Sequence, residues 1–358
     1  PVVGKVFGVQ DDEARWQLYS VSHPNVPVST QKYVQVGHFF EEVTLAQEEP
    51  GAPFLIINKQ GEAISRIDRV NNHPVVLAHN FCDGLALICT DELKYGYINT
   101  RGEIQIEPIY DMAFDFSDNL ALVGKSNQKG QIAWRVIDKQ GHVKFPISLT
   151  DSRISEGYSC KLLTYRDMKR GYCGALDIDG KTVFRLPSDI KNLLPYIYNA
   201  AICVATNGVG LVSSKGEILI QPNYENGKII APDRVAFQWK GKWALFDFGG
   251  KPLSEFVYDD ILASFHPESM FVCKDSIYYL MNNQGKIIDG NRYEMVYTDD
   301  IISRHTPQIF LRHPEKTDEP KEEQQADTPH TKPLDKQKPL SSNSGGLTQI
   351  KLVREISK

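Results

Sequence analysis

Two short stretches of the sequence resemble phosphate- or calcium-binding motifs, and both lack residues that the chemistry requires. GKS at 124–126 resembles the end of a phosphate-binding loop, which needs another glycine at position 119, where the chain has Asn119. DIDG at 177–180 begins like a calcium loop, but the later carboxylates and the closing glutamate are missing. His73 and His79 are too far apart for a short metal-ligand spacing, and no GxSxG or HExxH motif occurs. We therefore expect no catalytic site, no metal and no cofactor.

The six cysteines also lack a chemical pattern. None forms a CxxC pair, which argues against a zinc ribbon or a thioredoxin-like site. Most stand in apolar, strand-like surroundings, so we expect buried free thiols, with disulfides as the alternative in an oxidising compartment. Because the chain starts with Pro1 rather than Met and has no reactive cysteine motif, a periplasmic or secreted location is preferred to a cytoplasmic one.

The composition is that of a globular protein. The 358 residues are 41% hydrophobic and 24% charged, with a formal net charge of -5. A mildly acidic chain lacks the basic footprint of nucleic-acid binding, and no apolar run approaches the roughly 20 residues that span a bilayer. We therefore expect neither a nucleic-acid partner nor a membrane span.

An internal repeat indicates the secondary structure of the chain. A four-residue segment that starts with Asn, Asp or Ser and ends with Gly occurs seven times: NKQG (58–61), NTRG (99–102), DKQG (138–141), DIDG (177–180), SSKG (213–216), DFGG (247–250) and NNQG (282–285). Successive glycines lie 34 to 41 residues apart. The residue types are typical of a type I turn followed by a glycine with positive φ, which is a common β-hairpin connection.

The flanks of these turns read as strands. Polar and apolar residues alternate after each glycine, as in GEIQI (102–106), and LALI (85–88) and LALV (120–123) supply a third strand. The proline in IEPIYD (106–111) suits the edge of a sheet, because it leaves a strand without a donor. Residues Trp16 to His23 fit the same register as a degenerate further copy. Eight units of about 37 residues are therefore expected.

These units resemble the WG-repeat proteins of bacteria. The resemblance rests on YGYI (95–98), CG (173–174), VGLV (209–212) and WA (243–244), each followed by the hairpin turn, although Trp-Gly itself does not occur. It implies an architecture of β-hairpin repeats and no particular activity.

The size of the unit predicts an all-β fold in which each repeat is one blade of a propeller. We expect a seven- or eight-bladed ring over residues 1–312, because closure removes exposed strand edges, and an open β-hairpin solenoid is the alternative. Residues 313–346 are rich in Pro, Glu, Lys and Ser and read as a disordered linker. The apolar segment 347–358 then reads as an element that docks, either against the N-terminal strand 2–9 or on a partner.

Candidate binding residues come from the places where the repeat is interrupted. Residues 151–172 and 185–199 break the pattern, and aromatic and Arg side chains on loops of a rigid scaffold are typical partner contacts. We accordingly single out Tyr165, Arg166, Arg170, Tyr196, Tyr198, Ile350 and Leu352, the last two in the C-terminal segment. The alternative is that Tyr196 and Tyr198 are packed strand residues and the basic cluster a solvated loop.

The aromatic residues before the turns have a simpler interpretation. Phe54, Tyr95, Trp134, Trp243 and Tyr278 share one register, and residues repeated in register normally pack between repeats. We therefore expect a non-catalytic scaffold that binds another protein, as an adaptor or as an immunity-type protein. A carbohydrate or cell-envelope module, and an enzyme whose site is assembled around a propeller channel, are the alternatives, and a small-molecule ligand stays open.

Overall fold

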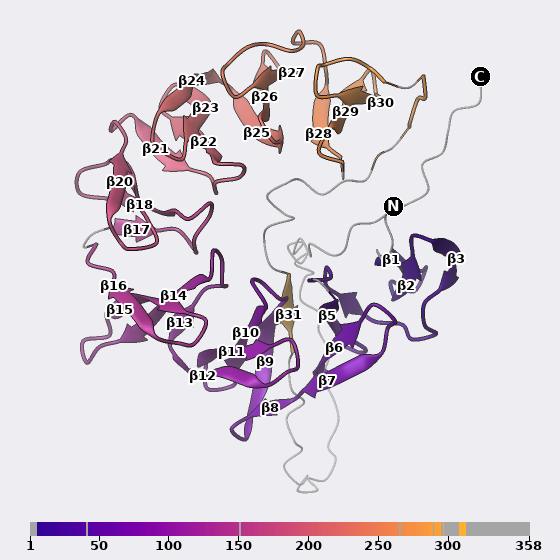
Figure 1. Cartoon of the computed structure of the whole chain (residues 1–358), viewed down its shortest axis with the longest axis vertical. Coiled ribbons are helices and arrows are strands. Elements are labelled where there is room, and N and C mark those ends of the chain that lie inside the picture. Colours follow the sequence, from indigo (N-terminus) through magenta and orange to yellow (C-terminus); the bar gives the residue numbers. More distant parts are fainter. Residues whose placement is uncertain are drawn as a thin grey trace, which may run out of the picture.

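The computed structural model describes residues 6–40, 42–149, 152–264, 266–288, 290–294, 296 and 308–312. These residues form β-strands and no helix. The strands make eight small antiparallel sheets that follow one another around a ring, numbered here as blades 1 to 8 in chain order (Figure 1). The predicted propeller is thus confirmed, with eight blades, and the solenoid alternative is not what the chain forms.

The first four blades are built as follows. Blade 1 contains β1 (Val6–Gln10), β2 (Trp16–Ser20) and β3 (His23–Pro27), and blade 2 contains β4 (Gln35–Val36), β5 (Val43–Gln47), β6 (Phe54–Asn58) and β7 (Ala63–Ile67). Blade 3 contains β8 (Arg69–Val70), β9 (His73–His79), β10 (Leu85–Thr90), β11 (Tyr95–Asn99), β12 (Ile104–Tyr110) and, from the far end of the chain, β31 (Ile309–Leu311). Blade 4 contains β13 (Met112–Ala113), β14 (Leu120–Ser126), β15 (Ile132–Asp138) and β16 (Val143–Pro146).

The other four blades complete the ring. Blade 5 contains β17 (Ser152–Ile154), β18 (Leu163–Asp167), β19 (Cys173–Leu176) and β20 (Thr182–Arg185), and blade 6 contains β21 (Ile190–Leu193), β22 (Ala200–Ala205), β23 (Gly208–Ser213) and β24 (Ile218–Tyr224). Blade 7 contains β25 (Asn226–Ala231), β26 (Arg234–Trp239) and β27 (Lys242–Asp247), and blade 8 contains β28 (Asp260–Ala263), β29 (Ser269–Lys274) and β30 (Ile277–Asn282).

The predicted hairpin turns are confirmed at all seven positions. At the turn between β6 and β7, the Asn58 side-chain oxygen accepts the backbone N–H groups of Gln60 and Glu62 at 3.0 and 2.9 Å, and Gly61 N donates to Asn58 O at 2.9 Å. The seven turn glycines all have φ between 75° and 84°, a region that a side chain disfavours. The sequence pattern therefore sets the tip of each outer hairpin through purely local contacts.

The glycine of the WG-like motif is required for a different reason from the turn glycines. A Cβ atom on Gly96 would lie 2.6 Å from the backbone oxygen of Ile106 and 2.6 Å from the nitrogen of Pro108, because β12 shifts register opposite this residue. Gly210 meets β24 in the same way, at 2.3 Å from the Ile220 oxygen. Blade 7 has no fourth strand at this place and carries Ala244 there.

The core consists of seven apolar clusters, and each lies between two consecutive blades. The middle strands of several blades are apolar on both faces for this reason, as in the buried patterns of β10 and β22. Of the five aromatic residues before the turns, Phe54 and Trp243 are buried in such clusters, which confirms for them the expected packing role. Four of the six cysteines are buried, and all six are free, as expected.

Carboxylates add polar links at the blade junctions. Asp111 accepts Lys94 Nζ from blade 3 and, at 2.7 Å, the backbone N–H of Ser126 from blade 4, and these bonds lower its pKa to about 2. Asp259 repeats the arrangement between blades 7 and 8, where it accepts Lys242 Nζ and the N–H of Asp275. These directional bonds fix the orientation of one blade relative to the next, which non-directional apolar packing alone would not do.

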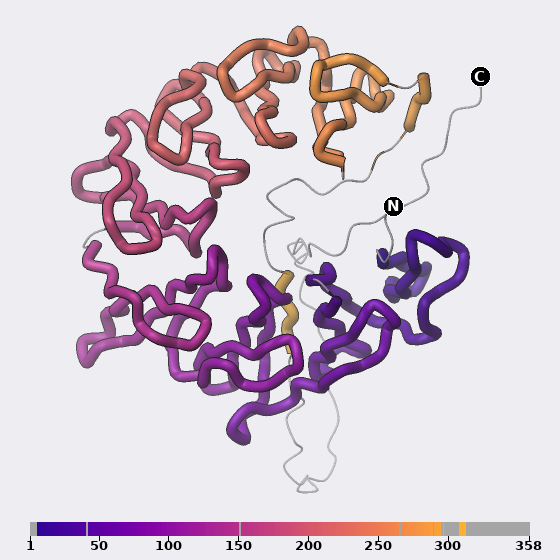
Figure 2. The backbone as a smooth tube through the Cα atoms, in the orientation of Figure 1, coloured from indigo at the N-terminus to yellow at the C-terminus, as the bar shows by residue number. Residues whose placement is uncertain are grey.

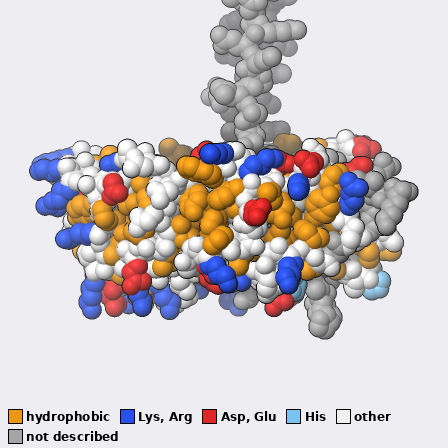
Figure 3. All heavy atoms as spheres, turned by 90° about the horizontal axis from the view of Figure 1, so that it is seen from above, with side chains coloured by type: hydrophobic (Ala, Val, Ile, Leu, Met, Phe, Trp, Pro, Cys, Tyr) orange, Lys and Arg blue, Asp and Glu red, His pale blue; other side chains and the backbone are white. Residues whose placement is uncertain are grey.

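The outer wall of the ring carries an apolar band. Seen edge-on, hydrophobic side chains gather at mid-height, and charged side chains lie along the two rims (Figure 3). Residues shortly after the turn glycines contribute to the exposed apolar surface of the outer strands, for example Ile104 at 39% and Val143 at 49% exposure. Because an exposed apolar residue recurs at this position from blade to blade, we attribute the apolar band to the repeat rather than to a single binding site.

Gly96→Ala tests the explanation of the motif glycine. Because the new methyl group would clash with backbone atoms of β12, we expect a loss of about 1–3 kcal/mol in the free energy of unfolding, measured by chemical denaturation. Ala244→Gly in blade 7 is the matched control and should cost less than about 1 kcal/mol. Equal stability of Gly96→Ala and the parent protein would contradict the explanation.

Candidate functional site

The most unusual element of the ring is the short strand β31 on its inner side (Figure 1). It extends blade 3 at the inner edge, where Ile309, Phe310 and Leu311 pair antiparallel with His79, Ala78 and Leu77. Blade 3 therefore ends, toward the middle of the ring, in a strand that comes from the far end of the sequence.

Phe310 anchors this strand. Its side chain is fully buried in the cluster between blades 2 and 3, with its ring centroid 6.3 Å from that of Phe54. The two neighbours point the other way, as alternation along a strand requires: Ile309 is 50% and Leu311 57% exposed. Phe310 is therefore the apolar anchor of the strand, and two apolar side chains remain accessible beside it.

Gln308 and Asn80 form a buried polar network at one end of β31. Asn80 N donates to Gln308 O at 2.8 Å, and the Gln308 side-chain oxygen accepts His38 N at 2.5 Å. The Asn80 amide donates to His38 O at 2.6 Å and accepts Leu45 N at 3.1 Å. A Cβ atom on Gly37 would lie 2.5 Å from the Asn80 amide nitrogen, so only glycine leaves room for this network.

Arg312 fixes the other end of β31. Its Nε donates to Gly51 O at 2.8 Å, its Nη1 pairs with the Asp68 carboxylate at 2.7 Å, and its backbone N–H donates to Val76 O at 2.8 Å. The Arg312 side chain is only 12% exposed. Blades 2 and 3 are thus joined through both ends of the strand.

The free edge of β31 is where the site can make new bonds. Residues 308, 310 and 312 bond to β9, so the backbone groups of Ile309 and Leu311 point away from it. Gln35 Nε2 donates to Ile309 O at 2.9 Å. Within the described ranges, the N–H groups of Ile309 and Leu311 and the Leu311 carbonyl have no partner. An edge of this kind can pair with another strand through main-chain bonds and apolar contacts.

A contact between a histidine and a carboxylate lies beside this edge. His79, the pairing partner of Ile309, has its Nδ1 2.7 Å from Asp115 Oδ2 of blade 4, and both side chains are less than a fifth exposed. The other Asp115 oxygen is buried and has no hydrogen-bond partner among the described residues. Those residues also contain no group of three His, Cys, Asp or Glu side chains that could hold a metal ion. The site is therefore suited to strand pairing and apolar contact.

Two of the predicted binding residues belong to the core. Tyr165 lies in β18 and is 4% exposed, and Tyr196 is 3% exposed with its hydroxyl donating to Ser213 O at 3.2 Å. Their interpretation as surface anchors is corrected: the stretches 151–172 and 185–199 are not loops throughout but contain β17, β18 and β21. Both tyrosines pack between consecutive blades, and burial raises the pKa of each.

The other predicted residues do not form one patch with the strand edge. Arg166 Nη1 donates to Lys191 O at 2.5 Å and ties blade 5 to blade 6. Arg170 pairs with Asp167 at 3.2 Å and is exposed, and Tyr198 is 40% exposed at a turn with φ 52°. A binding role of Arg170 and Tyr198 stays a prediction. Ile350 and Leu352 lie outside the described residues.

Sequence reasoning missed Ile309 and Leu311. The available signal was the stretch QIFLR (308–312), in which three apolar residues follow the last full repeat just before the composition changes. Nothing local to these five residues says which blade they join.

A family comparison identifies the repeat. Residues 95–129 match the family model described as WG containing repeat. This segment is a WG repeat. It covers β11, β12, β13 and all of β14, so one WG repeat runs from the outer half of blade 3 into blade 4, and the resemblance seen in the sequence is confirmed there. No curated protein sequence matches the chain significantly.

Solved structures resemble the chain in fold. The crystal structure of a eukaryotic initiation factor is 10% identical, and the match covers 88% of this chain and 89% of that one with a TM-score of 0.51. BamB from Moraxella catarrhalis is 12% identical over 78% of this chain and 93% of its own, with a TM-score of 0.38. AztD from Citrobacter koseri is 12% identical over 79% and 93%, with a TM-score of 0.36. At such identities the likeness concerns the fold alone. In the described part of the chain, no helix is long and apolar enough to cross a membrane.

Substitutions in β31 separate its anchor from its exposed edge. Phe310→Ala removes a fully buried ring, and we expect a loss of about 3–5 kcal/mol in the free energy of unfolding. Leu311→Ala removes an exposed side chain and should change that value by no more than about 0.5 kcal/mol. Thermal and chemical denaturation of both variants checks this, and a Leu311→Ala loss equal to that of Phe310→Ala would show that the edge is already covered.

Proposed function

We propose that this protein is a non-catalytic scaffold that binds another protein, and that it takes an extended apolar segment of that partner at the free edge of β31. The observation that carries the proposal is the pair of exposed side chains, Ile309 and Leu311, on a strand whose outward N–H groups and Leu311 carbonyl are unpaired among the described residues, while the Ile309 carbonyl accepts Gln35 Nε2. Strand addition to a sheet edge gives affinity through main-chain bonds and specificity through alternate side chains.

The rigidity of the strand supports this proposal. A binding element that is already fixed loses little conformational entropy when a partner arrives. β31 is held by the buried ring of Phe310, by the Asn80 network and by Arg312, so its edge is preorganised. An unanchored strand of three residues would have to order on binding.

Other features argue against the glycan alternative. A stacking platform for sugars needs exposed aromatic rings, and Phe54 and Trp243 are buried between blades. Tyr95, Trp134 and Tyr278 are half-buried, so the glycan alternative stays a prediction for these three. The enzyme alternative and the expectation of no catalysis stay predictions.

Affinity capture from an extract of the source cell tests the proposal. The bait is the intact chain, and the test variant is I309D/L311D, which places charge on the edge without touching the Phe310 anchor. The matched control is V143D/V183D, because Val143 and Val183 are also exposed apolar strand residues, on the outer wall. We expect a stoichiometric protein partner that the control retains and the edge variant loses, as measured by mass spectrometry, with melting temperatures within a few degrees.

Retention of the partner by I309D/L311D would contradict the strand-edge site. A chain that ends at Arg312 is the further arm of the same experiment. Loss of the partner only in that arm would assign binding to the C-terminal segment that contains Ile350 and Leu352, and would leave β31 with a purely structural role.

A further inference from the structure

One face of blade 1 and one face of blade 8 have no neighbouring blade among the described residues. Blades 2 to 7 each pack one face on the blade before and one face on the blade after. The seven clusters join blades 1 through 8 in succession, and within the described ranges none joins blade 8 to blade 1. The tube drawing shows these two blades at the two ends of the ring (Figure 2).

The free face of blade 8 repeats the residue pattern of a packed face. In blade 7, the face toward blade 8 is formed by Ile230, Ala236, Trp243 and Leu245, all 7% exposed or less. The strand register places Phe271, Tyr278 and Leu280 of blade 8 at the positions of Ala236, Trp243 and Leu245. A fourth apolar residue of blade 8, Leu262, stands where blade 7 has Lys228. These four are only half-buried, and Tyr293 contacts the ring of Phe271 at 5.9 Å.

Blade 1 carries the complementary half. In blade 7, the paired residues Val235 and Phe246 face blade 6 and are buried. Their counterparts in blade 1 are Phe7 and Tyr19, which are also paired and stack with ring centroids 5.9 Å apart. Val9, on the same face of β1 as Phe7, is 38% exposed.

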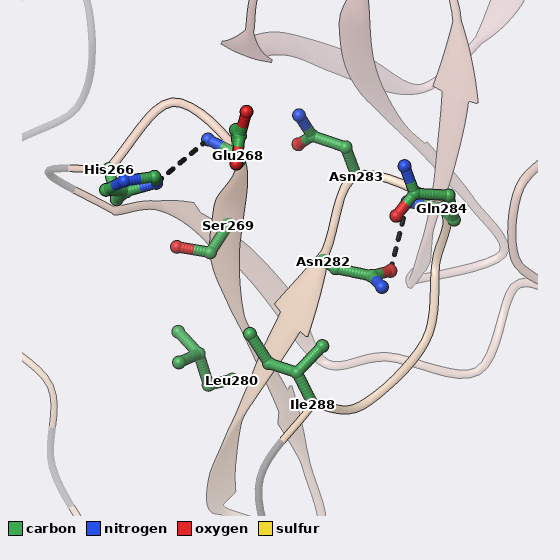
Figure 4. Close-up of a pocket in the computed structure, with 8 residues that line it drawn as sticks. All are labelled: His266, Glu268, Ser269, Leu280, Asn282, Asn283, Gln284 and Ile288. Atoms are coloured by element: carbon green, nitrogen blue, oxygen red, sulfur yellow. Dashed lines mark hydrogen bonds between the residues drawn. The ribbon is translucent and has the colours of Figure 1, made fainter.

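A pocket lies on the same side of blade 8. It has a volume of about 660 Å³ and is lined by Leu280 and Ile288 beneath the polar side chains of the 266–269 loop and the 282–284 turn (Figure 4). The Asn283 side-chain oxygen is buried there and has no hydrogen-bond partner among the described residues. A buried acceptor without a partner costs free energy, and the half-buried apolar residues leave apolar surface that a packed neighbour would cover.

We propose that these two faces are the halves of an eighth interblade interface, and that blade 1 docks on blade 8 of the same chain. The face of blade 8 then becomes buried like the seven others, and the pocket is covered. This inference is independent of the proposed function, because it concerns the ring and not the edge of β31.

The return of the chain to blade 3 favours docking within one molecule. Val296 follows blade 8, and Gln308 is fixed beside blades 2 and 3 by its bonds to Asn80 and His38. The 12 residue steps between them span at most about 40 Å when fully extended. Blade 8 is thus tethered close to the first blades, which gives blade 1 a high effective concentration at its face.

A double-mutant cycle tests the interface. Phe7→Ala, Phe271→Ala and the double variant are compared by chemical denaturation. Faces that pack against each other should couple, so the unfolding equilibrium constant of the double variant should differ at least about threefold from the product of the single effects. The matched control pairs Phe7→Ala with Val143→Ala, which should be additive because Val143 lies in the outer strand of blade 4.

Hydroxyl-radical footprinting of the unmodified protein gives an answer that does not depend on the variants folding. We expect Tyr19, Phe271 and Leu280 to be protected as strongly as Phe246, while Trp239, which is 44% exposed, reacts. Reaction of the three at the level of Trp239, or additive effects in the cycle, would overturn the proposal. Protection or coupling that appears only at concentrations where light scattering detects a dimer would also overturn it, in favour of a second copy as the occupant.

Discussion

Each blade consists of only a few short strands with apolar residues on both faces, so no blade can bury its own core. The fold therefore depends on the contact between one blade and the next, and the seven apolar clusters are those contacts. Local features serve this packing. The turn glycines set the hairpin tips, Gly96 lets the outer strand approach closely, and Asp111 links two blades through a carboxylate with a lowered pKa.

The strand β31 uses the same packing for another purpose. Phe310 enters the cluster between blades 2 and 3 as a residue of the blades themselves would. Because side chains alternate along a strand, burial of the Phe310 side chain exposes Ile309 and Leu311 on the inner side of the propeller. The structural role of β31 and its proposed binding role thus follow from one geometric constraint.

The sequence predicted the parts of the fold that local chemistry decides. Asn58 and Gly61 form their turn through contacts within four residues, and the same pattern recurs at all seven hairpins. The strands β17, β18 and β21 were missed because they are only three to five residues long, too short for a clear alternation. Tyr165 in β18 and Tyr196, which follows β21, were misassigned with them. The pairing of Ile309 with His79 was beyond prediction, because it depends on the curvature of the whole ring rather than on residues near either position.

Amide hydrogen exchange along residues 308–312, followed by NMR in the isolated intact protein, tests the central claim most directly. The anchored, unpaired edge predicts an alternation: slow exchange at Phe310 and Arg312, whose N–H groups face β9, and fast exchange at Ile309 and Leu311, whose N–H groups face away. Fast exchange at all four amides would show that β31 is not anchored. Slow exchange at all four would show that its edge is already paired and not available to a partner.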